Sequence, residues 1–317
     1  MTAASVFRPA RRPIADRVFR AVTLLCGMAV LAVLVLIVYS MTKQALPAFR
    51  AAGAGFVTSD EWVPNAGKFG ALAFIYGTLV ISAIALVLAV PLSVGIALFL
   101  TEVAPRRLRQ GISYAIDLLA AVPSVVFGLW GLLVLSPLIV KLYADIASGT
   151  EGVPVLGTLF GGPVNGKSFF TAGIVLALMI TPIITLLVRE VFDTVPPGQK
   201  EAALALGATR WEMIRQTVFP HSRAGVIGAV MLGLGRAMGE TIAAALVIGS
   251  SPQLTARLFG AGDAMAAVIA NQFGEAGGTH RSALIGLGVV LFFVTVLVNI
   301  AAQTVVRRMS VHEGAAT

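Results

Sequence analysis

Six long apolar segments decide what this chain can fold into. Each is long enough to cross a hydrocarbon core of ~30 Å. Lipid offers no hydrogen-bond partners, so only helices or closed barrels can span it, and these segments lack the alternation of barrel strands. The sequence therefore predicts an all-α membrane protein with six transmembrane helices. The segments cover residues 21–41, 70–100, 111–142, 169–189, 224–249 and 282–306.

The composition supports a membrane environment. Hydrophobic residues make up 57 % of the 317 residues and charged residues only 12 %, and the mean hydropathy is +0.91. A soluble domain of this length cannot bury so much apolar surface. The second and third segments exceed the thickness of a bilayer, so we expect these helices to tilt, or to kink at Pro91, Pro123 or Pro137.

Five arginines precede the first apolar segment within residues 1–20, and signal peptides also have positive charges before their apolar region. The apolar run over 21–41 is too long for the hydrophobic region of a signal peptide, and no A-x-A cleavage pattern follows it. We therefore expect a cytoplasmic N-terminal segment, 1–20, and a retained anchor helix, 21–41.

The positive charges predict the orientation. Fifteen of the 23 Lys and Arg lie in the N-terminal segment, the loops 101–110 and 189–223, and the tail 307–317. Positive residues accumulate on the cytoplasmic side of membrane proteins, so we expect both termini in the cytoplasm and the chain in the plasma membrane. The formal net charge of +8 is then a topology signal. No basic stripe with interleaved aromatic residues indicates a nucleic-acid partner.

The sequence shows no residue pattern typical of a metal site or a catalytic site. Cys26 is the single cysteine, which excludes a disulfide within the chain, and the three histidines are widely separated. Neither pattern has the spacing of a metal site. No nucleophile or acid–base set assembles either. The chain is therefore expected to be neither a metalloprotein nor an enzyme.

The longest predicted cytoplasmic loop, 190–223, contains a pattern for two short helices. Pro197 suits the first position of a helix, and the following run of Glu, Ala and Leu favours helix strongly. Gly207 is expected to end that helix. Thr209 and Glu212 form a capping-box pattern that starts a second helix, which we expect Pro220 to limit before the next span.

This loop resembles the EAA loop of ABC importer permeases. The family pattern is E-A-A, three residues, G, nine residues, and I-x-L-P. The residues that match at this spacing are Glu201, Ala202, Ala203, Gly207 and Pro220. The resemblance implies that the loop sits in a cleft of a separate ATPase, which would use the ATP and Mg. This chain itself would bind no cofactor.

Two positions depart from the EAA pattern, since Thr217 replaces the usual isoleucine and Phe219 the usual leucine. Both fall in the tail of the motif, so the expected ATPase-coupling residues are unaffected. The alternative is an ordinary loop helix that lies on the membrane surface. The coupling residues are Glu201, Ala202, Ala203, Leu206 and Gly207.

Three further stretches, 69–79, 117–131 and 233–243, are similar to the PstC family of phosphate-specific permeases. Parts of them are shared with the related PstA family. The resemblance implies the type I ABC importer fold over a permease domain, 70–306. It also implies a heterodimer with a PstA-like permease, a PstB-like ATPase dimer in the cytoplasm and a PstS-like phosphate-binding protein outside.

Arg236 and Glu240 are the candidate residues of the substrate path. They fall near the middle of the predicted fifth span at i and i+4, which places both on one helix face. Charged residues at this depth usually face a cavity or a partner, and the planar fork of arginine binds oxyanions in bidentate fashion. Glu240 would hold Arg236 between passages or accept a proton from monobasic phosphate. The alternative is a structural ion pair.

Asp117 and Ser124 are weaker candidates for the same path. Asp117 opens the predicted third span, where a carboxylate can also serve as a helix-start residue. Ser124 follows Pro123 at a predicted kink, although hydroxyls in spans commonly bond their own backbone. Gly233, Gly235 and Gly239 are attributed to close helix packing.

Residues 161–168 satisfy the ATP-binding pattern G-x-x-x-x-G-K-[ST]. A functional P-loop needs a preceding buried strand, whereas here a membrane span follows directly and the expected topology puts the loop outside. Pro163 also removes an N–H from the cradle. We interpret the segment as an external turn, in which Lys167 could contact a docked binding protein.

The sequence therefore predicts a permease subunit of an ATP-driven phosphate importer. A permease for sulfate or molybdate is the alternative within this class. An ion-coupled secondary transporter is the alternative outside it, but no inverted repeat is visible and such a protein needs no EAA loop.

Overall fold

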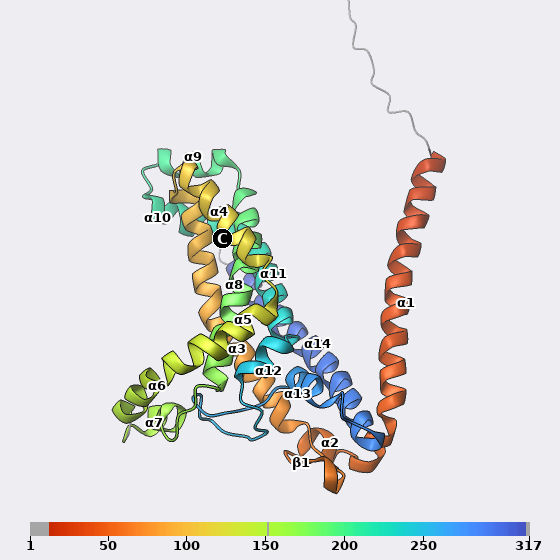
Figure 1. Cartoon of the computed structure of the whole chain (residues 1–317). Coiled ribbons are helices and arrows are strands. Elements are labelled where there is room, and N and C mark those ends of the chain that lie inside the picture. The colour runs from red at the N-terminus through yellow and green to blue at the C-terminus, as the bar shows by residue number, and fades with distance from the viewer. Residues whose placement is uncertain (1–12, 151, 315–317) are drawn as a thin grey trace, which may run out of the picture.

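The computed structural model describes residues 13–150 and 152–314, which form a bundle of long helices with one small hairpin (Figure 1). Helix α8 runs through the bundle, and α3 packs along it. The longer helices are α1 (Pro13–Ala52), α3 (Leu72–Leu98), α4 (Arg106–Ala120), α6 (Ser136–Thr150), α8 (Phe169–Asp193), α11 (Phe219–Met238) and α14 (Gly278–Gly314).

Short elements connect the long helices. The hairpin pairs β1 with β2 antiparallel, with Trp62 opposite Phe69. The short helices and strands are α2 (Gly55–Thr58), β1 (Trp62–Val63), η1 (Pro64–Ala66), β2 (Lys68–Phe69), α5 (Ser124–Trp130), α7 (Pro154–Phe160), α9 (Pro197–Ala205), α10 (Arg210–Met213), α12 (Ile242–Val247) and α13 (Met265–Gln272). Three π-helical turns continue neighbouring helices: η2 (Phe99–Val103), η3 (Gly131–Leu135) and η4 (Ile214–Val218).

Within the described residues, five helices are long and apolar enough to cross a membrane. They correspond to the predicted first, second, fourth and sixth spans, with shifted or longer bounds, and they place the third at Ser124–Thr150 rather than 111–142. Residues 111–120 belong to α4, which ends before Pro123. The chain breaks there because Pro123 has no N–H to continue α4 and disfavours a helical backbone at the residue before it.

The prediction of one continuous helix over 224–249 is wrong. Helix α11 ends at Met238, and α12 begins only at Ile242. Gly239 is the C-cap residue of α11. Glycine loses more conformational freedom in a helix than other residues do, which favours a break at this position.

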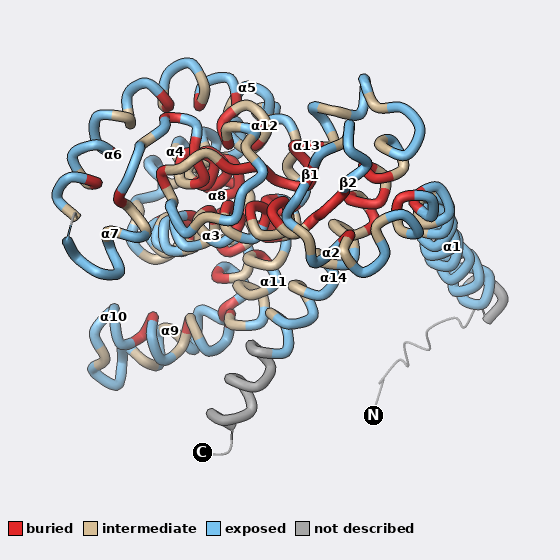
Figure 2. Tube along the Cα trace, turned by 90° about the horizontal axis from the view of Figure 1, so that it is seen from below, coloured by how far each residue is buried: buried red, intermediate tan, exposed pale blue. Residues whose placement is uncertain are grey.

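The main core lies where α3 packs on α8, with α11 and α12 against it. Figure 2 shows that buried residues gather along these central helices, whereas α1 is exposed over most of its length. A second core at one end joins α1, α2, the hairpin, the start of α3, α13 and α14, and it includes Phe56, Trp62, Phe74 and Leu287. The indole of Trp62 donates to Oε1 of Gln272 at 3.1 Å, so this end is fixed by a hydrogen bond as well as by packing.

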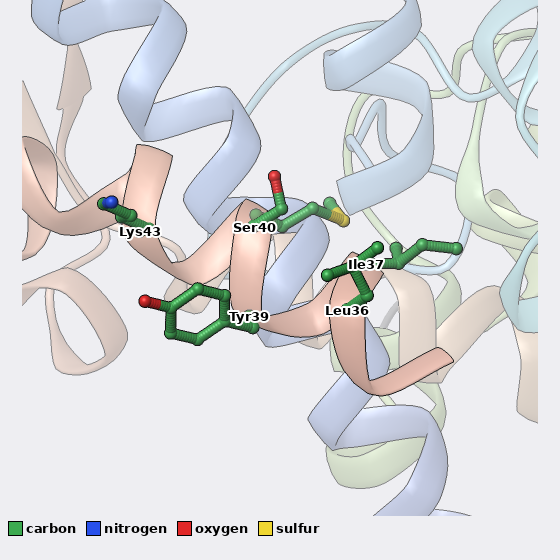
Figure 3. A pocket seen from close by; sticks show the side chains of 6 residues that line it. Leu36, Ile37, Tyr39, Ser40 and Lys43 are labelled. Atoms are coloured by element: carbon green, nitrogen blue, oxygen red, sulfur yellow. The ribbon is translucent and has the colours of Figure 1, made fainter. Parts of the chain in front are cut away.

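Helix α1 borders a cavity of about 550 Å³ lined by Leu36, Ile37, Tyr39, Ser40, Met41 and Lys43 (Figure 3). All these residues come from α1 itself. In Figure 3 the hydroxyl of Ser40 points away from that of Tyr39. Polar groups that do not converge cannot orient a small ligand. The cavity therefore follows from the exposure of α1 and gives no candidate site.

Candidate functional site

The loop between α8 and α11 folds as the two short helices that the sequence predicts. Pro197 occupies the first turn of α9, and α9 ends with Leu206 as its C-cap. Gly207 has a φ of +89°, the left-handed conformation that favours glycine after a helix. The matched E-A-A residues therefore lie on a helix that stops where the family pattern has its glycine.

Helix α10 begins with the predicted capping box. The hydroxyl of Thr209 accepts from the backbone N–H of Glu212, and the carboxylate of Glu212 accepts from the N–H of Thr209 at 2.7 Å. This hydrogen bond to the backbone holds the pKa of Glu212 below its ordinary value. The geometry fixes the turn that follows Gly207.

The prediction that Pro220 limits the second helix is wrong. The chain stays helical from α10 through η4 into α11, and Pro220 lies in the first turn of α11. Inside a continuous helix, proline removes one i→i−4 hydrogen bond, so the bonding pattern has to change near it. The wider π-helical turn η4 immediately precedes it, as is common where a helix departs from regular bonding.

The α9–α10 segment presents apolar side chains that the rest of the described chain does not cover. Leu206 is 90 % exposed and Trp211 is 61 % exposed, and Leu204 is also exposed. Glu201 and Ala202 lie on the exposed part of α9, whereas Ala203 packs partly against the main core. We call Leu204, Leu206 and Trp211 the loop tip. Large apolar side chains exposed within one short segment are typical of a surface that meets another protein.

Two ion pairs tie residues 193–200, which lead into α9, to residues 102–109 between the end of α3 and the start of α4. Lys200 Nζ lies 2.6 Å from Oε1 of Glu102, joining α9 to η2. Arg109 of α4 donates to both carboxylate oxygens of Asp193 at the end of α8, at 2.8 and 2.7 Å. Neither pair is predicted from the sequence. Lys200 and Arg109 serve there only as evidence for topology, because nothing in a sequence pairs residues so far apart.

Arg236 and Glu240 do not share a continuous helix, contrary to the expectation from the sequence. Arg236 lies in the last turn of α11, and Glu240 lies in the break before α12. Oε1 of Glu240 accepts from the backbone N–H of Ala243 at 3.2 Å, so this carboxylate is engaged by the start of α12. Arg236 is positive and lies at the C-terminal end of α11, and Glu240 is negative and precedes the N-terminal end of α12. Each helix dipole therefore favours the charge beside it.

Among the described residues, the guanidinium of Arg236 has no hydrogen bond or ion pair, and its side chain is exposed in the single chain. An arginine in an otherwise apolar segment is rarely left facing lipid. Figure 1 places the junction of α11 and α12 between the two ends of the bundle. We therefore expect this guanidinium to face a partner or an aqueous path.

The structure brings Ser124, but not Asp117, toward the break. Ser124 begins α5, and α5 packs on α12 so closely that a Cβ on Gly128 would overlap Ala243. Asp117 instead lies in the last turns of α4, with an exposed side chain, and does not open a span. Its carbonyl accepts from Ala121, which only closes the helix.

Residues 161–168, the P-loop pattern, join α7 to α8, and no strand precedes them directly within the described chain. Ser168 is the N-cap of α8 and accepts from the N–H of Thr171. The backbone N–H of Asn165 donates to the carbonyl of Phe259, so the turn is pinned to the 249–264 connection. The segment is therefore a structural turn rather than a phosphate cradle.

Asp263 is a buried carboxylate in this 249–264 connection, outside the five apolar spans. Its Oδ1 accepts from the N–H of Ala264 at 2.8 Å. Thr78 of α3 accepts from the next N–H, that of Met265, at 3.0 Å. Burial raises the pKa of Asp263 from 3.8 to about 6, with the Ala264 hydrogen bond opposing the rise.

We expect Asp263→Asn to stabilise the protein at pH 7.5. Between pH 3.8 and about 6 the folded carboxyl holds its proton more tightly than the unfolded one, so stability falls as the pH rises through this window. Above it the buried charge costs up to about 3 kcal/mol. The amide can still accept from Ala264. The melting temperature should rise at pH 7.5 and stay nearly unchanged about one pH unit below 3.8, where the carboxyl is mostly protonated in both the folded and the unfolded chain.

The exposed Asp60→Asn is the matched control and should change little at either pH. A lower melting temperature of Asp263→Asn at pH 7.5 would contradict the pKa argument.

Comparison with known proteins decides the family. Residues 89–311 match the family model described as "Binding-protein-dependent transport system inner membrane component". The chain is 48 % identical over 301 residues to the phosphate transport system permease protein PstC of Xylella fastidiosa (strain Temecula1), covering 95 % of this chain and 93 % of that protein. This chain belongs to the PstC family of permeases. It is also 43 % identical over 307 residues to PstC of Mesorhizobium japonicum, covering 96 % and 94 % of the two chains.

A solved structure confirms the fold of this PstC-family chain. A crystal structure titled as a bacterial ABC transporter involved in the import of alginate aligns with a TM-score of 0.60 and 18 % identity, covering 92 % of this chain and 99 % of that one. At this identity the likeness concerns the fold alone. The all-helical ABC importer permease fold predicted from the sequence is confirmed.

Membership of the PstC family also settles what kind of component this is. It is a multi-pass inner-membrane permease and a transport subunit, and ATP hydrolysis resides on a separate ATPase. The family works with an ATPase and a binding protein. The prediction of a transport subunit whose ATPase is a separate chain is thereby confirmed.

Proposed function

We propose that this chain conducts inorganic phosphate across the inner membrane as one subunit of an ATP-driven importer. One observation carries the proposal: three PstC phosphate permeases are 40–48 % identical to this chain over 95–96 % of its length. At this similarity the substrate path is expected to be shared. The specific partners would be a PstA-like permease forming a heterodimer, a PstB-like ATPase dimer and a PstS-like binding protein.

The side that carries α9 and α10 is cytoplasmic in this proposal, and both termini lie there. The loops 101–110 and 189–223 carry most of the positive charge of the loops. Figure 1 supports this arrangement, because the start of α1 lies at the same end of the bundle as α9, with β1 at the opposite end. The anchor helix, 21–41, and the permease domain, 70–306, would then both cross the membrane.

The coupling loop, 190–223, would dock on the ATPase. The support is physical: Leu206 and Trp211 expose apolar surface on a loop whose backbone is fixed at Gly207 and at the Thr209 capping box. A preformed, apolar tip can bind without a large ordering cost. Glu201, Ala202, Ala203, Leu206 and Gly207 are the proposed contact or shaping residues.

Arg236 would line the phosphate path. Its guanidinium is free within the described chain, and its fork geometry suits an oxyanion. Glu240 would hold the start of α12 and so position the break, while Ser124 would offer a hydroxyl from neighbouring α5. Asp117 has the weakest support, since it lies on exposed α4 away from the break.

Reconstituting the chain with its partner permease, ATPase and binding protein in proteoliposomes tests the function. We expect uptake of labelled phosphate that requires ATP, with sulfate and molybdate competing weakly at equal concentration. Uptake without ATP would support an ion-coupled transporter and refute the proposal. Stronger competition by sulfate or molybdate than by unlabelled phosphate would keep the ABC importer but change its cargo.

A further inference from the structure

The two cytoplasmic ion pairs connect the same two segments with opposite polarity. Residues 102–109 supply an acid, Glu102, and a base, Arg109, while residues 193–200 supply the complementary Asp193 and Lys200. Sliding one segment along the other would bring like charges together, which is unfavourable. The arrangement therefore fixes the register of the segment leading into α9 against the α3–α4 connection.

The Lys200–Glu102 pair is the stronger link of the two. Its side chains are 19 % and 8 % exposed, whereas those of Arg109 and Asp193 are 37 % and 45 % exposed. Exposed pairs contribute little, because water screens them. Removing one partner of a shielded pair leaves an uncompensated charge, which is strongly unfavourable. The ends of Lys200 and Glu102 are thus constrained to move together.

The positions of Lys200 and Glu102 determine which helices the ion pair connects. Lys200 lies within α9, one residue before Glu201. Glu102 lies in the π-helical turn η2 that continues α3, and α3 packs along the central helix α8. Helix α9 also contacts α10 and η4, which lead to α11. Helix α9 therefore has two connections to the bundle: an ionic one to α3 and a packed one toward α11.

We propose that the Lys200–Glu102 pair is the positioning contact through which a movement of α9 reaches α3. This inference rests on the proposed docking of the coupling loop on an ATPase. Displacement of α9 pulls Glu102 with Lys200, and the π-helical turn η2 provides the place where the end of α3 can change its winding. Arg109 and Asp193 keep the register of the two segments but transmit less of the movement. Without the pair, a movement of α9 reaches only α11.

The test uses the complete reconstituted importer and measures phosphate taken up per ATP hydrolysed. Lys200→Met and Glu102→Gln each remove one charge of the pair. We expect uptake per ATP to fall about 10-fold, a size typical of coupling between sites, while the ATPase stays bound and active. The exchange variant Lys200→Glu with Glu102→Lys restores the attraction and should recover most of the loss, which a merely structural role for either side chain would not produce.

Controls separate this proposal from the docking on which it rests. Lys68→Met breaks the 2.7 Å pair with Glu61, which is exposed on the hairpin, and should leave uptake per ATP unchanged. Leu206→Asp alters the loop tip and should release the ATPase. Retention of the ATPase by Leu206→Asp would refute docking through the tip. Normal uptake per ATP in both single variants, or an exchange variant no better than they are, would overturn the role of the pair.

Discussion

Arg236→Gln is expected to lower ATP-driven phosphate uptake about 100-fold, the loss that follows when charge-assisted hydrogen bonds to an oxyanion are removed. The guanidinium has no partner within the described chain, so its removal breaks no internal ion pair. Assembly should therefore be normal. Uptake of labelled phosphate by vesicles, normalised to the amount of purified complex, measures the effect. Uptake near the wild-type rate at normal complex levels would exclude Arg236 from the path.

Glu240→Gln is the matched control for Arg236→Gln. The glutamine oxygen can still accept from the N–H of Ala243, so a purely positioning Glu240 predicts uptake close to normal. A proton-accepting Glu240 predicts a large loss instead, because an amide cannot take up the proton. Arg236→Lys keeps the charge but loses the fork, and an intermediate rate would show that bidentate geometry contributes.

Local patterns predicted the coupling segment well. Pro197, Gly207 and the Thr209–Glu212 box act through bonds within a few residues, and the structure confirms each of them. The wrong prediction at Pro220 has a local cause too, since the π-helical turn η4 directly before it lets the chain stay helical through the proline. Short-range rules succeed where the backbone partners are close in the sequence.

Hydropathy predicted less well where a helix is interrupted. Residues 224–249 form an apolar run, yet the chain breaks between Met238 and Ile242, and α12 then packs on α5 at Gly128, which is distant in the sequence. The third span begins at Ser124 rather than at residue 111 for a related reason, since Pro123 separates α4 from α5. Runs of apolar residues predict membrane depth but cannot reveal where a helix inside that depth is interrupted.

The ion pairs could not be predicted from local sequence patterns. Glu102 and Lys200 are separated by 98 positions, and each belongs to a loop whose charges are explained by orientation alone. Their pairing depends on how α3 and α8 pack side by side along their length. At the other end of α3, a similar long-range contact brings Gly77 against the backbone of Asp263.

Gly77→Ala is expected to destabilise the protein by about 3 kcal/mol or more, at the upper end of the effects of overpacking. A Cβ at this position would overlap the backbone carbonyl oxygen of Asp263 and would press on the ring of Phe169. Backbone cannot turn aside as a side chain can. The 249–264 connection would have to move, and the hydrogen bond from Met265 N–H to Thr78 would lengthen. The melting temperature of the purified complex and its yield from membranes should both fall.

Gly95→Ala on the same helix separates this contact from the general effect of replacing glycine. Gly95 lies in α3 and is exposed, and a Cβ added there would meet no atom within 4 Å. Alanine there should be neutral or stabilise the helix by up to about 1 kcal/mol, because it restricts the unfolded chain. The two substitutions thus differ in their expected effect although they are chemically identical. Equal melting temperatures for the two variants would show that α3 and the 249–264 connection are not held in contact at Gly77.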